Sequence, residues 1–252
     1  MTDTQEIQFV KNLRSKTSVS LKDCIEVARL SKYNTEEALK LLKVRGKKIL
    51  EKKSSRATNQ GTIAISTKLN SATIVALKTE TDFASRQEQF RTCSKQIADK
   101  LHDGYDRSSI DPIISDMVLS LRENIQLGDY GQLSGPLVNG YVHDHRIGAI
   151  VALDGGDVDL AYNLAVHIVA TQPRVIQINE LSADDIAREK AIYKETFKDK
   201  PVDIVDKIIS SKLESFYKEK VLLKQSYILD DNKTVEEVLG TVKVIGFKIV
   251  QL

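Results

Sequence analysis

The residue types that most often carry covalent chemistry are few in this chain and are poorly placed for it. The 252 residues include four histidines and two cysteines. Cys24 and Cys93 fall on the apolar faces of predicted helices, where neither is suited to act as a nucleophile beside His167. The sequence also lacks a glycine-rich phosphate loop, a Gly-x-Ser-x-Gly elbow and a His-Glu-x-x-His motif. We therefore expect no catalytic residues and no enzymatic bond chemistry.

A metal or cofactor site is not expected either. His143 and His145 could place two imidazoles on one side of a strand, but they bracket a predicted turn, and we interpret them as solvated side chains. Cys24 and Cys93 stand at neither metal-ligand nor redox spacing. Two such cysteines are typical of small buried residues in a reducing compartment.

The unusual feature is a loop that places an aromatic ring beside a carboxylate, Thr81-Asp82-Phe83-Ala84. It follows an apolar strand and precedes a helix, and two interpretations are open. In the first, which composition alone favours, Asp82 caps the helix and Phe83 turns inward. In the second, Phe83 points outward as a wedge that inserts into a partner protein.

Composition indicates a folded protein with no general affinity for nucleic acid. Thirty-seven basic and 35 acidic residues leave a formal charge of +2, and 41% of the residues are hydrophobic. So small a net charge predicts no nucleic-acid partner. The sequence has no run of about 20 apolar residues and no secretory signal, so we expect a cytoplasmic protein with no membrane association.

The first 50 residues predict a three-helix bundle. Apolar residues recur at helical spacing, and Ser20 and Asn34 are suited to cap the second and third helices. A basic and polar linker is expected over 51–60. The basic residues that accumulate from Lys43 to Arg56 suggest either an RNA-binding patch or a solvated helix end, and we favour the second because no aromatic residue is interleaved to stack on a base.

An internal repeat organises the remainder into two related α+β subdomains, expected over 61–130 and 131–252. Each copy reads as an antiparallel hairpin followed by a helix. In the first copy the helix is expected to bury Phe90, Cys93 and Ile97 on one face, and in the second copy the strands are expected over 137–143 and 147–153. The tetrapeptide Ile-Val-Ala-Leu occurs in both return strands, at 74–77 and 150–153. The simplest architecture is two small antiparallel sheets, each covered by helices on one face.

Two further helical segments are predicted. Asp111 and Pro112 are expected to open a helix that includes Ile125. The segment 182–218 predicts an antiparallel helical hairpin, because the link at 199–200 is too short for any other arrangement.

Motifs spread along the chain resemble those of the elongation factor Ts family. The loop that begins at Thr81 resembles the Thr-Asp-Phe-Val motif of that family. Other stretches match in the same order along the chain: Val10-Lys11-Asn12-Leu13-Arg14, Asp23-Cys24, Arg122-Glu123-Asn124-Ile125, Val166-His167-Ile168-Val169-Ala170 and Ser211-Lys212-Leu213-Glu214. The resemblance implies a ubiquitin-associated-like fold for the bundle and a duplicated core.

The resemblance also implies a partner, elongation factor Tu, and an activity, guanine-nucleotide exchange. The loop residues implied to dislocate magnesium from that partner are Thr81, Asp82, Phe83 and Ala84. The bundle residues implied to bind it are Arg14, Leu21 and Lys22, and His167 is implied as a contact from the second subdomain, or else is simply packed. Leu21 and Lys22 stand where members often carry methionines, and Ala84 stands in place of valine.

The alternative function is a protein- or RNA-binding module of the translation apparatus that has no exchange activity. The sequence leaves open whether a complex is one-to-one or a dimer of heterodimers, since exposed sheet faces could pair.

Overall fold

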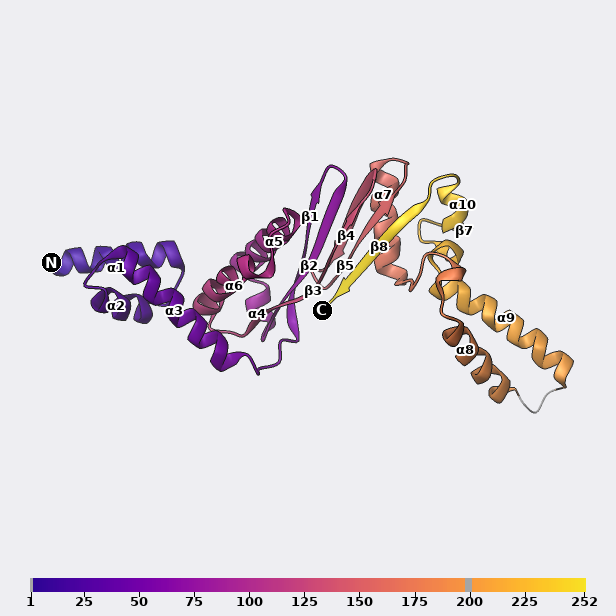
Figure 1. The fold of residues 1–252 in the computed structure, drawn as a ribbon, viewed down its shortest axis with the longest axis horizontal. Helices are drawn as coiled ribbons and strands as arrows, with labels where there is room; N and C mark the ends of the chain where they lie inside the picture. The colour runs from indigo at the N-terminus through magenta and orange to yellow at the C-terminus, as the bar shows by residue number, and fades with distance from the viewer. Residues whose placement is uncertain (1, 198–200) are drawn as a thin grey trace.

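The computed structural model describes residues 2–197 and 201–252, with the side chains of 202 and 203 excepted. The chain is a mixed α+β protein, as the sequence predicts. Figure 1 shows a helical bundle at the N-terminal end, two sheets in the middle and a helical hairpin at the opposite end. Among the described residues, no helix is both long enough and apolar enough to cross a bilayer.

The N-terminal bundle consists of α1 (Asp3–Thr17), α2 (Leu21–Leu30) and α3 (Thr35–Lys53). The predicted caps are confirmed, because the Ser20 and Asn34 side chains accept hydrogen bonds from the first turns of α2 and α3. α3 continues into the segment expected as linker and ends at Lys53. The bundle core includes Leu119 of a later helix, so the bundle packs directly on the rest of the molecule.

The first sheet has the order β1-β2-β3, with β1 (Gln60–Lys68), β2 (Ser71–Thr79) and β3 (Ile125–Ser134) all antiparallel. The short helix α4 (Asp82–Ser85) follows β2, and α5 (Glu88–His102) and α6 (Arg107–Leu121) follow in turn. The predicted apolar face of α5 is confirmed, since Phe90, Cys93 and Ile97 are buried.

The prediction for α6 is wrong at both ends. The helix begins at Arg107, where Asp106 caps it by accepting a hydrogen bond from the Ser109 amide, and Pro112 lies inside it. Ile125 belongs to β3, a strand that the sequence pattern did not reveal. Its polar and glycine-rich second half hides the alternation expected of a strand.

The second sheet has the order β4-β5-β8, formed by β4 (Leu137–His143), β5 (Ile147–Leu153) and β8 (Val244–Gln251). The bounds of β4 and β5 are those predicted, and α7 (Val158–Thr171) packs on this sheet.

The two sheets pack face to face through a shared apolar layer. Residues of both sheets, among them Ile63, Ile74, Val138, Ile150 and Val250, form one buried cluster. These two faces are therefore covered within one chain and are not free to pair between copies.

The hairpin consists of α8 (Ala183–Thr196) and α9 (Val202–Lys220), which lie side by side (Figure 1). The link at 199–200 lies outside the described residues. Shorter elements connect the hairpin to the second sheet: η1 (Ile178–Glu180), η2 (Leu222–Lys224), β6 (Ser226–Tyr227), β7 (Asp230–Thr234) and α10 (Val235–Leu239).

Candidate functional site

The loop after β2 presents Phe83 to solvent. Thr81 caps α4, because its hydroxyl accepts a hydrogen bond from the Ala84 amide at 3.3 Å. Phe83 is 79% exposed, whereas Ala84 is 2% exposed and anchors the turn to the core. The interpretation with Asp82 as cap and Phe83 inward is therefore wrong, since Thr81 is the cap and Ala84 takes the inward position.

Glu123, at the junction between α6 and β3, holds the start of this loop. Its carboxylate accepts hydrogen bonds from the Thr79 hydroxyl at 2.7 Å, the Thr81 amide at 3.0 Å and the Thr81 hydroxyl at 2.5 Å. Hydrogen bonds to a charged acceptor are stronger than neutral ones, so this clamp gives the exposed ring a rigid base. Sequence reasoning gave Glu123 no role, although it lies in one of the motifs that carry the family resemblance.

A second carboxylate, that of Glu80 directly after β2, contacts the same junction between α6 and β3. It accepts a hydrogen bond from the Asn124 amide at 2.6 Å and forms ion pairs with Arg56 at 3.1 Å and Lys53 at 3.6 Å. Burial alone would raise the pKa of Glu80, but the Asn124 amide, Arg56 and Lys53 together lower it below its ordinary value. Glu80 therefore remains ionised at neutral pH and ties the end of α3 to the loop.

Asp82 borders a charged hollow. Its carboxylate lies 3.3 Å from the Arg86 guanidinium, and both side chains are well exposed. The hollow has a volume of about 390 Å³ and is lined by Gly61, Asp82, Ser85, Arg86, Arg91, Asp144, His145 and Arg146. The turn between β4 and β5 thus contributes to this surface, and the site is built from both sheets.

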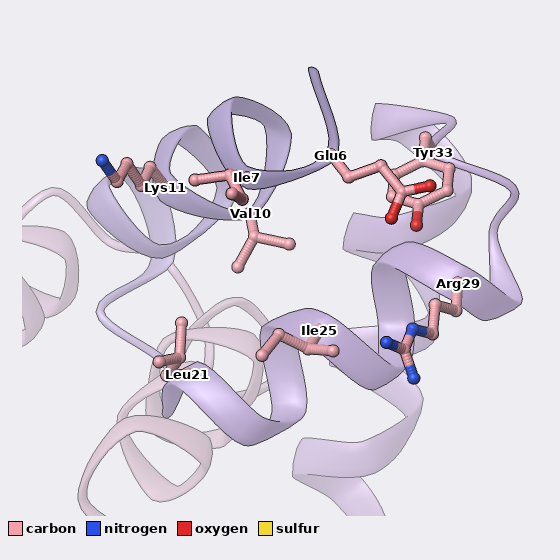
Figure 2. Close-up of a pocket in the computed structure, with 8 residues that line it drawn as sticks. All are labelled: Glu6, Ile7, Val10, Lys11, Leu21, Ile25, Arg29 and Tyr33. Atoms are coloured by element: carbon pink, nitrogen blue, oxygen red, sulfur yellow. The ribbon is translucent and has the colours of Figure 1, made fainter. Parts of the chain in front are cut away.

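The bundle residues implied to bind a partner form a separate surface. Arg14, Leu21 and Lys22 are all exposed, and Leu21 is 49% exposed at the start of α2. Leu21 also lines a groove of about 350 Å³ between α1 and α2. Figure 2 shows apolar side chains of the two helices on opposite sides of this groove, Ile7 and Val10 from α1 and Leu21 and Ile25 from α2.

His167 is fully buried in α7, so the structure does not offer it as a surface contact. Its Nδ1 accepts a hydrogen bond from the Ile228 amide at 3.2 Å, which requires Nε2 to carry the proton and donate to Gln225 Oε1 at 3.0 Å. The ring also stacks on Tyr227. Burial lowers the pKa of His167 although the bond to Gln225 opposes this, so the ring is neutral at physiological pH.

The basic stretch of α3 and its linker is partly neutralised by ion pairs. Arg45 forms ion pairs with Asp23 and Glu26, and Lys53 and Arg56 pair with Glu80. Cations already paired with carboxylates are poorly available to phosphates, which supports the solvated helix end over the RNA patch.

Comparison with known proteins identifies the family. The model of the family described as Elongation factor TS matches residues 80–252, more than half of the chain. The chain belongs to the elongation factor Ts family. Its relatives include an elongation factor Ts of Chlorobium phaeobacteroides, 34% identical over 91% of this chain and 89% of that protein. Another, from Psychrobacter arcticus, is 31% identical over 96% of this chain and 88% of that protein.

Membership assigns the chain to translation elongation and to protein biosynthesis. The elongation factor Ts family is one of exchange factors rather than catalysts of covalent chemistry. The family match begins at Glu80, so it includes both the Phe83 loop and the Glu123 clamp.

Proposed function

We propose that this protein is a guanine-nucleotide exchange factor in the cytoplasm. It binds elongation factor Tu carrying GDP, disrupts the magnesium and nucleotide site, and promotes release of GDP so that GTP can enter. The observation that carries the proposal is Phe83, a large apolar ring that is 79% exposed on a firmly held turn. An exposed aromatic ring on a rigid support is typical of residues that dominate a protein interface.

The physical basis of exchange is thermodynamic linkage. A protein that binds the nucleotide-free GTPase more tightly than the GDP form must weaken GDP binding by the same factor. Bound magnesium demands nearly ideal octahedral geometry, so a small displacement of its surroundings weakens the metal and the nucleotide together. Phe83 would insert between elements of the GTPase domain and supply that displacement.

Asp82 would act beside the wedge on the magnesium surroundings. Among the described residues, the Asp82 carboxylate forms an ion pair with Arg86 alone. Because both side chains are exposed, this ion pair is weak, and Asp82 can exchange it for contacts with a partner. Thr81 and Ala84 would keep the shape of the loop, the first as the cap of α4 and the second as its buried anchor.

The remaining contacts would come from the bundle and the second subdomain. Leu21 would bind through the groove between α1 and α2, and the exposed side chains of Arg14 and Lys22 would add charged contacts. His167 would act indirectly by holding the turn that exposes Ile228. The helical hairpin would serve at most as an anchor.

The test is stopped-flow release of a fluorescent GDP analogue from elongation factor Tu of the same genome, across a magnesium titration. We expect acceleration by orders of magnitude at catalytic amounts of this protein. No acceleration by the folded protein would contradict the proposal. RNA binding with a steep salt dependence, together with no effect on GDP release, would instead favour the non-catalytic binding module.

A further inference from the structure

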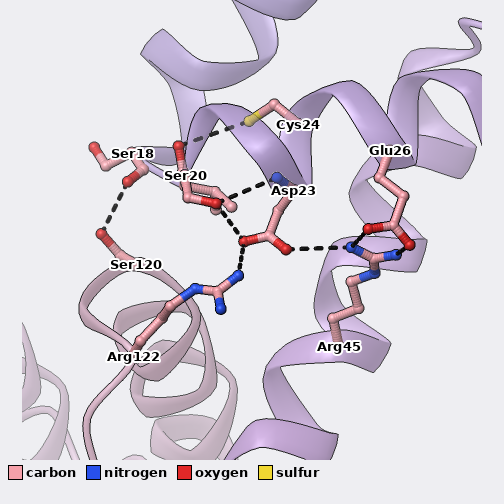
Figure 3. Close-up of polar contacts among 9 residues, drawn as sticks. Ser18, Ser20, Asp23, Cys24, Glu26, Arg45, Ser120 and Arg122 are labelled. Carbon is pink, nitrogen blue, oxygen red and sulfur yellow. Dashed lines mark hydrogen bonds and ion pairs between the residues drawn. The ribbon is translucent and has the colours of Figure 1, made fainter.

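An ion pair connects the bundle to the core at the end of α6. Arg122 donates a hydrogen bond to the carboxylate of Asp23 in α2, which also pairs with Arg45 of α3 at 3.3 Å. Figure 3 shows the two guanidinium groups approaching Asp23 from two sides. The Asp23 side chain is 9% exposed, so the pair is shielded from solvent on the carboxylate side. Nearby, the Ser120 hydroxyl donates to the Ser18 carbonyl at 3.1 Å.

The backbone of Arg122 has a conformation that favours glycine. Arg122 is the C-cap residue of α6 and has a φ of 55°, in the left-handed region. A side chain at this position costs free energy that glycine would avoid. The ion pair with Asp23 offsets this cost with a stabilising contact that glycine, which has no side chain, could not form.

The same short segment also holds the Phe83 loop. The residue after Arg122 is Glu123, whose carboxylate clamps Thr81. The Arg122 carbonyl accepts a hydrogen bond from Lys53 at the end of α3. Residues 122–124 therefore contact the bundle on one side and the loop on the other.

Apart from this pair and the Ser120–Ser18 hydrogen bond beside it, the bundle is held chiefly along one line, where α3 packs against α6 and Leu119 enters the bundle core. α3 packs on α6 so closely that a Cβ at Gly46 would lie 2.7 Å from the Ser115 carbonyl oxygen. Contact along a single helix pair leaves rotation about that line weakly opposed. Asp23 lies on a different helix, so the Arg122 pair adds an attachment away from the line and resists rotation.

We propose that Arg122 is a positioning residue that fixes the bundle relative to the Phe83 loop, so that both meet one partner together. This inference rests on the proposed function, because it assumes that the two surfaces bind the same protein. When two contacts are rigidly connected, formation of the first raises the effective concentration of the second. Loosening the connection lowers affinity and leaves the loop itself intact.

The central variant is Arg122→Gly, which removes the ion pair and also relieves the unfavourable φ. Asp23 keeps Ser20 and Arg45 as partners, so the variant should fold and should not lose stability. The matched control is Gln172→Gly, because Gln172 is likewise an exposed C-cap residue with a φ of 47°, but on α7. Arg122→Lys keeps the charge and should give an intermediate result.

The position of the bundle relative to the core is measured in the free protein as the distance between two spin labels, by electron–electron double resonance. The labels are attached at Gln8→Cys in α1 and Gln96→Cys in α5. Both positions are exposed, whereas the native Cys24 and Cys93 are buried. Burial raises the pKa of Cys93 to about 12, so it will resist labelling. We expect a broader distance distribution in Arg122→Gly and an unchanged one in Gln172→Gly.

Exchange is measured as the rate of GDP release against the concentration of this protein. For Arg122→Gly we expect the concentration for half-maximal rate to rise about three- to tenfold, with the saturated rate within about twofold of the parent. Asp23→Asn should act similarly, and the double variant should lose little more than either single one.

A distance distribution in Arg122→Gly as narrow as in the parent would overturn the proposal. An unchanged half-maximal concentration despite a broadened distribution would overturn it as well. If the parent does not accelerate GDP release, the proposed function fails and the assigned role in exchange falls with it. The distance distributions then decide separately whether Arg122 fixes the bundle.

Discussion

Truncation of Phe83 is the most direct test of the wedge. A phenylalanine side chain buries about 200 Å² when it is enclosed, and Phe83 is 79% exposed, so about 160 Å² remains for a partner to cover. At about 25 cal/mol per Å² this area sets an upper limit of about 4 kcal/mol, and about 1.5–3 kcal/mol is typical for burial of such a side chain. Phe83→Ala should therefore slow catalysed GDP release about 10- to 150-fold.

The same arithmetic predicts a small effect on folding. Only about 40 Å² of the ring is covered within the chain, so the free energy of unfolding should fall by no more than about 1 kcal/mol. Thermal unfolding of the variant measures this directly. Phe83→Leu, which keeps much of the apolar volume, should retain part of the exchange activity.

The matched control is Leu69→Ala, because Leu69 is 94% exposed in the turn between β1 and β2 and lies outside the site. It should leave GDP release unchanged. If Phe83→Ala is as active as Leu69→Ala at all concentrations, the ring does not act as a wedge and the reasoning fails.

Three further predictions concern Asp82, Glu123 and His167. Asp82→Asn should slow GDP release about three- to tenfold at millimolar magnesium and make the release rate less dependent on magnesium concentration. Identical magnesium titrations for the variant and the parent would contradict the role of Asp82. Glu123→Ala removes three hydrogen bonds to a charged acceptor. It should lower the saturated rate of GDP release about tenfold and the free energy of unfolding by about 2 kcal/mol. If only the concentration for half-maximal rate changes, Glu123 does not position the loop. Because burial lowers the pKa of His167, the unfolded chain binds more protons than the folded one at mildly acidic pH, and stability should fall as the pH drops below about 6.5. Urea unfolding of His167→Gln should show a weaker pH dependence between about pH 5 and 7, and an equal dependence would refute this.

Much of the fold follows from signals that act over a few residues. Ser20 and Asn34 cap helices as predicted, because each side chain needs only a backbone amide three residues away. The hairpin of β4 and β5 was predicted to the residue, since two apolar runs flank a short polar turn. α6 was misplaced because Pro112 resembles a helix start, whereas the hydrogen bond from the Ser109 amide to Asp106 fixes the true one.

The candidate site was only partly predictable. The sequence singles out Asp82 and Phe83 by their types, but it left the direction of the ring open and favoured the wrong one. It also gave Glu123 no role and left His167 undecided between a packed residue and a surface contact. Each of these depends on which residues from other parts of the chain surround the side chain.

The sequence by itself indicated most of the elements, the internal repeat and the short list of residues with unusual character. It could do so because apolar periodicity, caps and turns are set by neighbours along the chain. Only the tertiary structure decided that Phe83 is exposed, that Glu123 reaches Thr81 across 42 positions and that Arg122 reaches Asp23 across 99. Such contacts arise from the packing of whole elements, and packing depends on every side chain in the shared core rather than on any local pattern.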